Sequence, residues 1–450
     1  MNISIIGSGY VGLVSGVCLA EKGHRVTCVD VDQEKVDKIN SGFSPIYETG
    51  LSELLKKNIG LKLTATTDLL RSVLNTDITM IAVGTPFNGS EIDLTFIREV
   101  SLRVGAALKE KPSYHLVVVK STVVPGTTDQ VVIPILEEAS GKKAGKDFGV
   151  GMNPEFLREG EAVRDFLFPD RIVLGGMDEK SIEVLEGVYS VFERTDKLRT
   201  NNRTAEMIKY TANSLLATMI SFSNEIGNLC AATEGVDVVD VMQGVHLDKR
   251  LSPILSDGSR LTPLFTSYLA AGCGFGGSCF PKDVMALIAH GKKAGQPMEL
   301  LDAVMKINKR QPGEILFLLK KNFSSLAGKN IAILGLAFKP GTDDMRESPA
   351  IPVVRGLLSE GARIKAYDPI AKDEAKKLFG NHDIVYTDNL AQTLEGAEAV
   401  VLLTRWEEFN NVPEALREMA PQPLFIDGRR MIEKHSVERY EGIGLSAAKK

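Results

Sequence analysis

Short apolar runs alternate with helix-like segments over roughly the first 200 residues of the chain. Residues 2–7 have the pattern of a buried strand, residues 11–22 that of a helix and residues 24–30 that of a second strand. This order is typical of a parallel unit with a crossover helix. Later apolar runs continue the alternation, at residues 78–83, 116–120, 148–152 and 172–175. The pattern predicts a doubly wound parallel sheet.

The pattern changes near residue 204, where the alternation of strands and helices stops. Apolar residues then recur at steps of three and four, at Ile208, Ala212, Leu215, Leu216, Met219, Ile226 and Leu229. This spacing predicts one long helix with a broad apolar face, over about residues 204–234. We expect a homodimer that is built partly on this helix. Two further helices are expected at residues 284–291 and 300–310.

A third unit begins at the apolar run of residues 329–336 and repeats the order of the first unit. A loop and a helix follow, and the next strand, residues 362–369, carries Asp368 at the place that Asp30 holds in the first unit. Later strands are expected at residues 399–404 and 423–427. The sequence therefore predicts an α/β protein with two Rossmann-like doubly wound domains joined by a long central helix.

Composition agrees with a globular protein of about two or three domains. The chain has 450 residues, of which 44% are hydrophobic and 25% charged, and a net charge of −5. This balance gives no general attraction to nucleic acid or to a membrane. The N-terminal segment lacks the positive leader of a signal peptide, and no apolar run is long enough to span a bilayer, so we expect a cytoplasmic protein. The expected domains are residues 1–200, 201–310 and 315–450, with a frayed tail from residue 446.

The five cysteines, Cys18, Cys28, Cys230, Cys273 and Cys279, are scattered along the chain. An odd number without a signal peptide argues against a disulfide framework. The first three lie in apolar patterns and are expected to be buried. No metal site is expected, because Cys273 and Cys279 lack a nearby histidine or a second cysteine pair at zinc-site spacing.

A glycine-rich segment follows the first strand and opens the first helix. It consists of Gly7, Ser8, Gly9, Tyr10, Val11 and Gly12, and it fits G-x-G-x-x-G. The glycines allow backbone amides to approach a pyrophosphate, while Asp30, at the end of the next strand, can accept hydrogen bonds from a ribose diol. A carboxylate would repel the 2′-phosphate of NADP, so the cofactor is expected to be NAD. Lys35 is either a residue near the ribose or an exposed helix lysine.

Cys279 lies in the segment GCGFGGSCFPKD, between two glycines and a predicted helix start. Gly276 and Gly277 permit close approach of a ligand, and Pro281 suits the first turn of a helix. A helix N-terminus and the nearby Lys282 both favour thiolate over thiol. A thiolate can add to an aldehyde, and the resulting thiohemiacetal can be oxidised to a thioester that water hydrolyses to an acid. An inert thiol, or a redox pair with Cys273, are the alternatives.

Such a reaction also needs a base and a group that stabilises an oxyanion. Lys209 and Asn213 are four residues apart and share one face of the long helix. Asp283 follows Cys279 closely and could position a water or a lysine. Glu155, in NPEFLREG, could activate the hydrolytic water. Each of these residues could instead be an ordinary solvated side chain.

Together these segments resemble the nucleotide-sugar 6-dehydrogenases of the UDP-glucose/GDP-mannose dehydrogenase family. The resemblance covers nearly the whole chain and rests on GSGYVGL, SPIYETGL, AVGTP, KSTVVPGTT, NPEFLREG, AEMIKYTANSLLATMISFSNEI, GFGGSCFPKD, GLAFKPGTDDMRESPA and FIDGRR. It implies an NAD-dependent four-electron oxidation of a sugar C6 alcohol, with UDP-glucose as the expected substrate and UDP-glucuronate, a precursor for polysaccharide biosynthesis, as the product. GDP-mannose and UDP-N-acetylated sugars are alternatives, and a non-catalytic NAD-sensing protein is an alternative of another class.

The resemblance also implies roles for individual residues. Cys279 matches the nucleophile, Lys209 and Asn213 the oxyanion pair, Asp283 and Thr122 the residues that position water and Lys209, and Glu155 the base of hydrolysis. Besides the glycine loop, the implied cofactor contacts are Asp30, Lys35, Thr85, Thr122, Glu159, Lys282 and Arg346. The implied substrate contacts are Glu155, Phe156, Leu157, Arg158, Glu159, Lys209, Asn213, Tyr268, Phe275, Gly276, Phe338, Lys339 and Arg429.

One segment departs from the pattern of the family. Its members usually carry an arginine before the cysteine that reaches the active site of the neighbouring subunit. Here Arg250 and Arg260 compete for that role, and neither has the usual spacing. Arg260 is the expected residue, because the segment SRL that contains it resembles the family segment better than the residues around Arg250 do.

Overall fold

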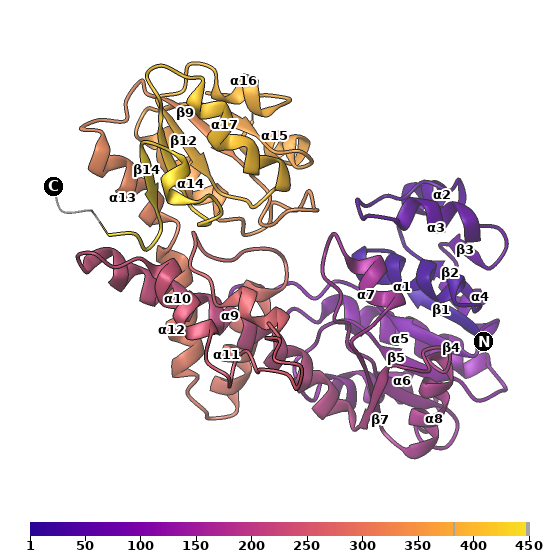
Figure 1. Cartoon of the computed structure of the whole chain (residues 1–450). Coiled ribbons are helices and arrows are strands. Elements are labelled where there is room, and N and C mark those ends of the chain that lie inside the picture. The colour runs from indigo at the N-terminus through magenta and orange to yellow at the C-terminus, as the bar shows by residue number, and fades with distance from the viewer. Residues whose placement is uncertain (381–382, 447–450) are drawn as a thin grey trace. The chain divides into compact units, whose positions relative to one another are not determined.

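The structure is a computed structural model, and it describes residues 1–380 and 383–446 (Figure 1). The chain divides into two compact units, Met1–Ala212 and Asn213–Lys450. Four of the five residues of the tail that is expected to be frayed, residues 447–450, lie outside the described residues. Within the described ranges, no helix combines the length and the apolar character that a membrane crossing requires.

Unit 1 is built on an eight-stranded sheet with the order β3-β2-β1-β4-β5-β6-β7-β8. The strands are β1 Asn2–Ile6, β2 Arg25–Val29, β3 Leu63–Thr66, β4 Ile78–Ile81, β5 Leu116–Val119, β6 Gly149–Met152, β7 Arg171–Gly176 and β8 Asp196–Thr200. The order reverses between β1 and β4, which is where doubly wound folds bind their ligands. The predicted sheet is thus confirmed.

The last two strands of this sheet, β7 and β8, differ from the all-parallel expectation, because both run opposite to β1–β6. β7 runs antiparallel to β6, with Gly151 paired to Gly176, whereas the other neighbouring strands are parallel. The connection between them, residues 153–170, contains only the six-residue helix α7 Ala162–Leu167. No full crossover helix returns the chain to the start of β6, so the chain comes back beside it in the opposite direction.

Helices cover both faces of the sheet in unit 1. Besides α7 they are α1 Tyr10–Glu21, α2 Gln33–Asn40, α3 Leu51–Asn58, α4 Leu69–Leu74, α5 Thr95–Glu110, the π-helical turn η1 Thr128–Val132, α6 Ile133–Ser140 and α8 Glu179–Val188. One buried apolar cluster includes side chains of α1, α3, α7 and α8, and a second includes side chains of α4, α5 and α6. Buried runs such as Leu116–Val119 follow from this cover on both faces.

Helix α9, Asn202–Ala232, has 31 residues and confirms the predicted long helix. The division between the two units falls within it, after Ala212. It has no proline or glycine before Gly227, so its backbone hydrogen bonds run without a break through the segment that carries Lys209 and Asn213.

Unit 2 contains a parallel six-stranded sheet with the order β11-β10-β9-β12-β13-β14. Its strands are β9 Asn330–Leu334, β10 Arg363–Tyr367, β11 Ile384–Tyr386, β12 Ala399–Leu402, β13 Leu424–Asp427 and β14 Tyr440–Gly442. Its helices are α10 Val238–His246, η2 Leu264–Tyr268, α11 Phe280–Lys293, α12 Glu299–Arg310, α13 Gly313–Asn322, α14 Ala350–Ser359, α15 Lys372–Phe379, α16 Leu390–Leu394, η3 Glu407–Asn411, α17 Val412–Arg417 and η4 Lys434–Ser436. The second Rossmann-like sheet is therefore confirmed.

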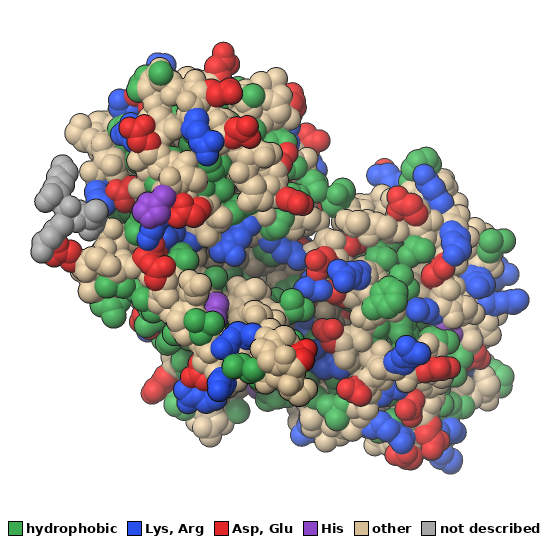
Figure 2. Space-filling model, in the orientation of Figure 1, with side chains coloured by type: hydrophobic (Ala, Val, Ile, Leu, Met, Phe, Trp, Pro, Cys, Tyr) green, Lys and Arg blue, Asp and Glu red, His purple; other side chains and the backbone are tan. Residues whose placement is uncertain are grey.

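The surface carries acidic and basic side chains that are interspersed. Figure 2 shows Lys and Arg side chains next to Asp and Glu side chains over the visible face. The mixture agrees with the small net charge of −5 for 450 residues.

Candidate functional site

The glycine loop joins β1 to α1 in unit 1. β1 ends at Ile6, and α1 begins at Tyr10 with Gly9 at its N-cap. Gly7 has a φ of +100°, and a Cβ atom on Gly12 would lie 1.8 Å from the carbonyl oxygen of Gly7. Only glycine therefore keeps the helix this close to the loop. The amides at the start of α1 can bind a pyrophosphate, so the loop fits a dinucleotide.

Asp30 follows β2 and holds the glycine loop in place. One of its carboxylate oxygens accepts a hydrogen bond from the amide of Ser8 at 2.8 Å, and the other accepts one from the amide of Asp32 at 3.1 Å. Its partly exposed carboxylate can bind a ribose diol. Lys35, in α2, lies 3.9 Å from Asp32, and its side chain is 44% exposed.

Glu48 connects three segments that carry the family resemblance. It is buried, and it accepts hydrogen bonds from the amides of Gly160 at 2.7 Å and Ala162 at 2.9 Å and from the hydroxyl of Tyr10. Burial and the neighbouring carboxylate raise the pKa of Tyr10, which therefore stays a hydrogen-bond donor. SPIYETGL thus ties the glycine loop to NPEFLREG. Glu48 was not singled out from the sequence, because a lone glutamate in this segment gives no sign of the groups that it binds across the fold.

Lys209 and Glu155 form a buried ion pair in unit 1. Nζ of Lys209 lies 2.9 Å from Oε1 of Glu155, and the side chains are 4% and 6% exposed. The other oxygen of Glu155 accepts a hydrogen bond from the amide of Leu157 at 2.7 Å, and the Lys209 ammonium lies 5.5 Å from the ring centre of Phe156. Burial alone would raise the pKa of Glu155, but Lys209, the Leu157 amide and Lys120 outweigh it and lower that pKa. Glu155 is held as a carboxylate, the form that can act as a base.

The loop that carries Thr122 is fixed from two sides. The hydroxyl of Thr85, in AVGTP, donates to the carbonyl oxygen of Thr122 at 2.7 Å. Further along the loop, the carboxylate of Glu206 accepts hydrogen bonds from the amides of Gly126 and Thr128 at 2.6 and 2.8 Å. Glu206 lies on α9 three residues before Lys209 and was not singled out from the sequence, because a glutamate on a helix is usually exposed.

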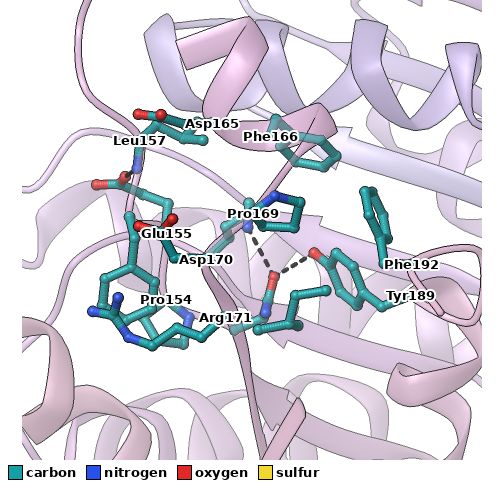
Figure 3. A pocket seen from close by; sticks show the side chains of 14 residues that line it. Pro154, Glu155, Leu157, Asp165, Phe166, Pro169, Asp170, Arg171, Tyr189 and Phe192 are labelled. Atoms are coloured by element: carbon teal, nitrogen blue, oxygen red, sulfur yellow. Dashed lines mark hydrogen bonds between the residues drawn. The ribbon is translucent and has the colours of Figure 1, made fainter. Parts of the chain in front are cut away.

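The first five residues of NPEFLREG, residues 153–157, help to line a cavity that Figure 3 shows from close by. The guanidinium of Arg171 lies 3.9 Å from the ring centre of Phe156. Arg158 forms ion pairs at 2.7 Å with Asp165 and with Glu161. These contacts order the segment that holds Glu155, and Glu159 lies in the same turn.

Cys279 is the N-cap residue of α11 in unit 2, as the sequence predicts. The amide of Asp283 donates to the carbonyl oxygen of Cys279 at 2.8 Å. Cys279 is partly exposed, whereas the other four cysteines are buried. Burial raises the pKa of Cys273 and so disfavours its thiolate form. A partly exposed sulfur at a helix N-terminus is suited to nucleophilic attack as a thiolate.

Asn213, Lys282 and Asp283 meet next to this helix start. Asp283 is buried, and its two oxygens accept hydrogen bonds from Nδ2 of Asn213 and from Nζ of Lys282, each at 2.6 Å. The Lys282 charge is therefore directed at Asp283. Asp283 fixes the amide of Asn213, which leaves the second N–H of that amide as a donor.

The glycines before Cys279 pack against backbone and aromatic groups of unit 2. A Cβ atom on Gly276 would lie 2.1 Å from the carbonyl oxygen of Glu347, and one on Gly277 would lie 2.7 Å from the ring of Phe338. The amide of Gly277 donates to the carbonyl oxygen of Arg346 at 2.8 Å. These contacts hold the cysteine loop against GLAFKPGTDDMRESPA.

Arg429 supports the same loop from FIDGRR. Its guanidinium donates to the carbonyl oxygens of Gly274 at 2.8 Å and Leu403 at 2.6 Å. Lys339 lies 5.9 Å from the ring centre of Phe338. The structure thus gives Arg429 a structural role in addition to the substrate contact that the resemblance implies.

The arginine segment folds back on itself. The guanidinium of Arg260 donates to the carbonyl oxygens of Leu247 at 2.9 Å and Ser252 at 2.7 Å, whereas Arg250 pairs with Asp248 and its side chain is 88% exposed. Near the start of α11, the ring centre of Phe280 lies 6.3 Å from that of Tyr268 and 6.0 Å from that of Phe275.

Three family models match the chain in order. They are described as the NAD binding domain, the central domain and the UDP binding domain of the UDP-glucose/GDP-mannose dehydrogenase family, and they match residues 1–193, 203–310 and 332–434. UDP-glucose 6-dehydrogenase AglM of Haloferax volcanii is 42% identical over 448 residues, which are 98% of this chain and 100% of that protein.

The chain belongs to the UDP-glucose/GDP-mannose dehydrogenase family. It is therefore an NAD-dependent oxidoreductase, as the sequence predicts. Among solved structures, a UDP-glucose dehydrogenase from Pyrobaculum islandicum matches with a TM-score of 0.89 and 38% identity, over 98% of this chain and 97% of that one. A UDP-D-ManNAc dehydrogenase from Pyrococcus horikoshii matches with a TM-score of 0.82 and 29% identity, over 99% of both chains. The UDP binding domain supports a nucleotide sugar as substrate.

Proposed function

We propose that this enzyme oxidises UDP-glucose to UDP-glucuronate in two steps through a covalent adduct on Cys279. The observation that carries the proposal is the environment of Cys279, which caps α11 beside the hydrogen-bonded side chains of Asn213 and Asp283. The names of the relatives support UDP-glucose as the substrate. The relative at 42% identity is named a UDP-glucose 6-dehydrogenase, and the structure with a TM-score of 0.89 is named a UDP-glucose dehydrogenase.

For each sugar, the reaction removes two hydrides, consumes one water and regenerates the thiol of Cys279. Bound NAD supplies the hydride acceptor, and Lys209 takes part in moving the proton of the C6 hydroxyl as the alcohol becomes an aldehyde. The Cys279 thiolate adds to the aldehyde carbon, and the oxygen of this thiohemiacetal is stabilised by the N–H groups of Asn213 and Lys209. Loss of the second hydride, to a second NAD bound in the same site, together with the proton of the thiohemiacetal oxygen, leaves a thioester. Water then attacks the thioester, Glu155 accepts its proton, and the acid and the thiol are released.

The other assignments belong to the same proposal. Thr122 and Asp283 position water and Lys209. The cofactor contacts are the glycine loop with Asp30, Lys35, Thr85, Glu159, Lys282 and Arg346. The substrate contacts are Phe156 to Glu159, Tyr268, Phe275, Gly276, Phe338, Lys339 and Arg429, with Arg260 from a second subunit. The domains proposed for these roles are residues 1–200, 201–310 and 315–450.

The sugar and the stoichiometry are tested in one assay. We expect two NADH for each UDP-glucose and one UDP-glucuronate, and much slower turnover of GDP-mannose, UDP-GlcNAc and UDP-ManNAc. One relative is named for UDP-D-ManNAc, so this comparison decides between real alternatives. Faster oxidation of another sugar nucleotide would replace the proposed substrate. One NADH per sugar would contradict the four-electron reaction.

Cys279→Ser tests the covalent step. A serine hydroxyl is not ionised near neutral pH, so we expect formation of UDP-glucuronate to fall by at least about 100-fold while NAD still binds. Cys230→Ser, at a buried cysteine on α9, is the matched control and should keep its turnover. Wild-type acid formation by the Cys279 variant would refute the covalent mechanism.

A homodimer through α9 remains a prediction, and the exposed side chains of that helix support it. Met207, Leu215, Phe222 and Leu229 are 38%, 59%, 49% and 62% exposed and follow one another at seven or eight residues, which places them in one stripe. Light scattering would test it, with the double variant Leu215→Glu and Phe222→Glu expected to be monomeric. The cytoplasmic location also remains a prediction from the sequence.

A further inference from the structure

A small cavity with a mixed apolar and polar lining lies beside Glu155 in unit 1. It has a volume of about 60 Å³, and its polar lining includes Lys120, Asn153, Glu155 and Tyr189 (Figure 3). A water molecule needs roughly 10–15 Å³ of such space and two to four polar partners. The cavity can therefore hold a few waters, and its lining offers both donors and acceptors.

Lys120 brings a positive charge to this cavity. It follows β5, its residue is 3% exposed, and its ammonium donates to Oδ1 of Asn153 at 2.8 Å. The same oxygen accepts the hydroxyl of Tyr189 at 2.5 Å, while Nδ2 of Asn153 donates to the carbonyl oxygen of Val173 at 2.9 Å. Asn153 is thus held rigidly, and it fixes the ammonium group.

The ammonium group has more donors than this partner uses. Asn153 accepts a hydrogen bond from one of the three N–H groups of this ammonium. Among residues 1–380 and 383–446, no other hydrogen-bond acceptor of Lys120 is found. Buried donors need partners, and a fixed cation that lines a cavity finds them in water.

We propose that the cavity binds water that joins the Lys120 ammonium to the Glu155 carboxylate, so that Lys120 positions and electrostatically supports the base of the hydrolysis step. This inference rests on the proposed function, because it assigns Glu155 to that step. Lys120 is then a positioning residue, since it acts on the substrate only through Glu155 and the bridging water.

The charges around Glu155 agree with this role. Burial lowers the pKa of Lys120 to about 8, and the negative charge of Glu155 opposes that decrease, so most of Lys120 is charged at neutral pH. Lys209 and Lys120 both act to lower the pKa of Glu155. The other titratable groups that line the cavity are Asp165 of α7, Asp170 and Arg171 before and at the start of β7, and Tyr189 after α8. Asp165 is paired with Arg158, and Arg171 is stacked on Phe156.

Lys120→Met tests the inference, because it keeps the length of the side chain and removes the charge. Acid formation is followed in single turnovers by rapid quenching, with enzyme in excess over UDP-glucose and NAD saturating, from about pH 3.5 to pH 8, because the pKa of Glu155 lies below its usual 4.5. Without the cation the pKa of Glu155 rises, so the carboxylate is lost at a higher pH. We expect the acid limb of the profile to move up by roughly one pH unit. The KM for NAD should not change.

Lys111→Met is the matched control. Lys111 is also buried, but its ammonium donates to the carbonyl oxygens of Val73 and Leu74, away from Glu155. Its removal should lower stability and leave the acid limb in place. Lys120→Arg, which keeps the charge, should keep the wild-type limb at a reduced rate, and Lys120→Gln gives the neutral comparison if the methionine variant does not fold.

Two failures are distinguished by the same measurements. If the wild type forms acid and the neutral Lys120 variants keep its acid limb, this inference is wrong and the proposed function stands. An equal movement in the Lys111 variant would also overturn the inference, because a general loss of stability would then explain it. If the wild type forms no acid from UDP-glucose, the proposed function itself is wrong.

Discussion

Glu206 is a buried carboxyl group on α9, and replacing it by glutamine should change how stability depends on pH. Its residue is 0% exposed, and its oxygens accept hydrogen bonds from the Gly126 amide at 2.6 Å and from the amide and hydroxyl of Thr128 at 2.8 and 2.7 Å. Burial raises the pKa of Glu206 from 4.5 to about 7, and these three hydrogen bonds only partly oppose the increase. The folded protein therefore holds a proton on Glu206 that the unfolded chain has already lost.

The sign and size of the effect follow from this difference. Because the pKa of Glu206 is higher in the folded protein, its contribution to stability is fully present below about pH 4.5 and is lost as the pH rises through about 7. The interval between 4.5 and about 7 corresponds to about 3 kcal/mol, of which about 2.5 kcal/mol falls between pH 5 and pH 8. Glu206→Gln removes this titration.

Urea unfolding at pH 5, 6, 7 and 8, followed by far-UV circular dichroism, measures the effect. The free energy of unfolding of the wild type, minus that of Glu206→Gln, should fall by about 2.5 kcal/mol from pH 5 to pH 8. Glu99→Gln, at an exposed carboxyl on α5, should give no such trend. A constant difference for Glu206→Gln would show that the carboxyl is ionised throughout, and the reasoning from burial would be refuted.

Two further substitutions test the glycine loop and the buried charges of unit 2. Gly12→Ala places a Cβ atom 1.8 Å from the Gly7 carbonyl oxygen, so we expect NAD affinity, measured by calorimetry, to fall at least about tenfold. The control Gly244→Ala, on α10, should leave NAD affinity unchanged. Unchanged affinity in the Gly12 variant would contradict the loop geometry. Asp237→Asn leaves the buried guanidinium of Arg430, now 2.8 Å from the carboxylate, without its countercharge, and should cost about 3 kcal/mol in urea unfolding. A loss below about 1 kcal/mol would mean that water compensates the charge.

Much of the fold follows from local patterns in the sequence. The spacing of apolar residues predicts α9, and the strand-glycine-helix order predicts both sheets, because these signals depend on neighbours within a few residues. Short elements such as β3, β8, β11 and β14 were not predicted, since a strand of three to five residues with mixed polarity has no clear pattern of its own. The direction of β7 was also missed, because strand direction depends on the path of the connection.

The sequence by itself determined which segments could be proposed to carry the chemistry: the glycine loop with Asp30, the cysteine at a helix start, and Lys209 with Asn213 one helical turn apart. Their order along the chain was enough, because each signal is a short segment. Only the tertiary structure decided how these groups are paired. The ion pair of Lys209 with Glu155, the hydrogen bond of Asn213 to Asp283 and the hydrogen bond of Lys120 to Asn153 join residues from 33 to 70 positions apart, and the cavity at Lys120 lies in space that no single segment contains. Burial and charge compensation act between side chains across space, and linear spacing carries no record of them.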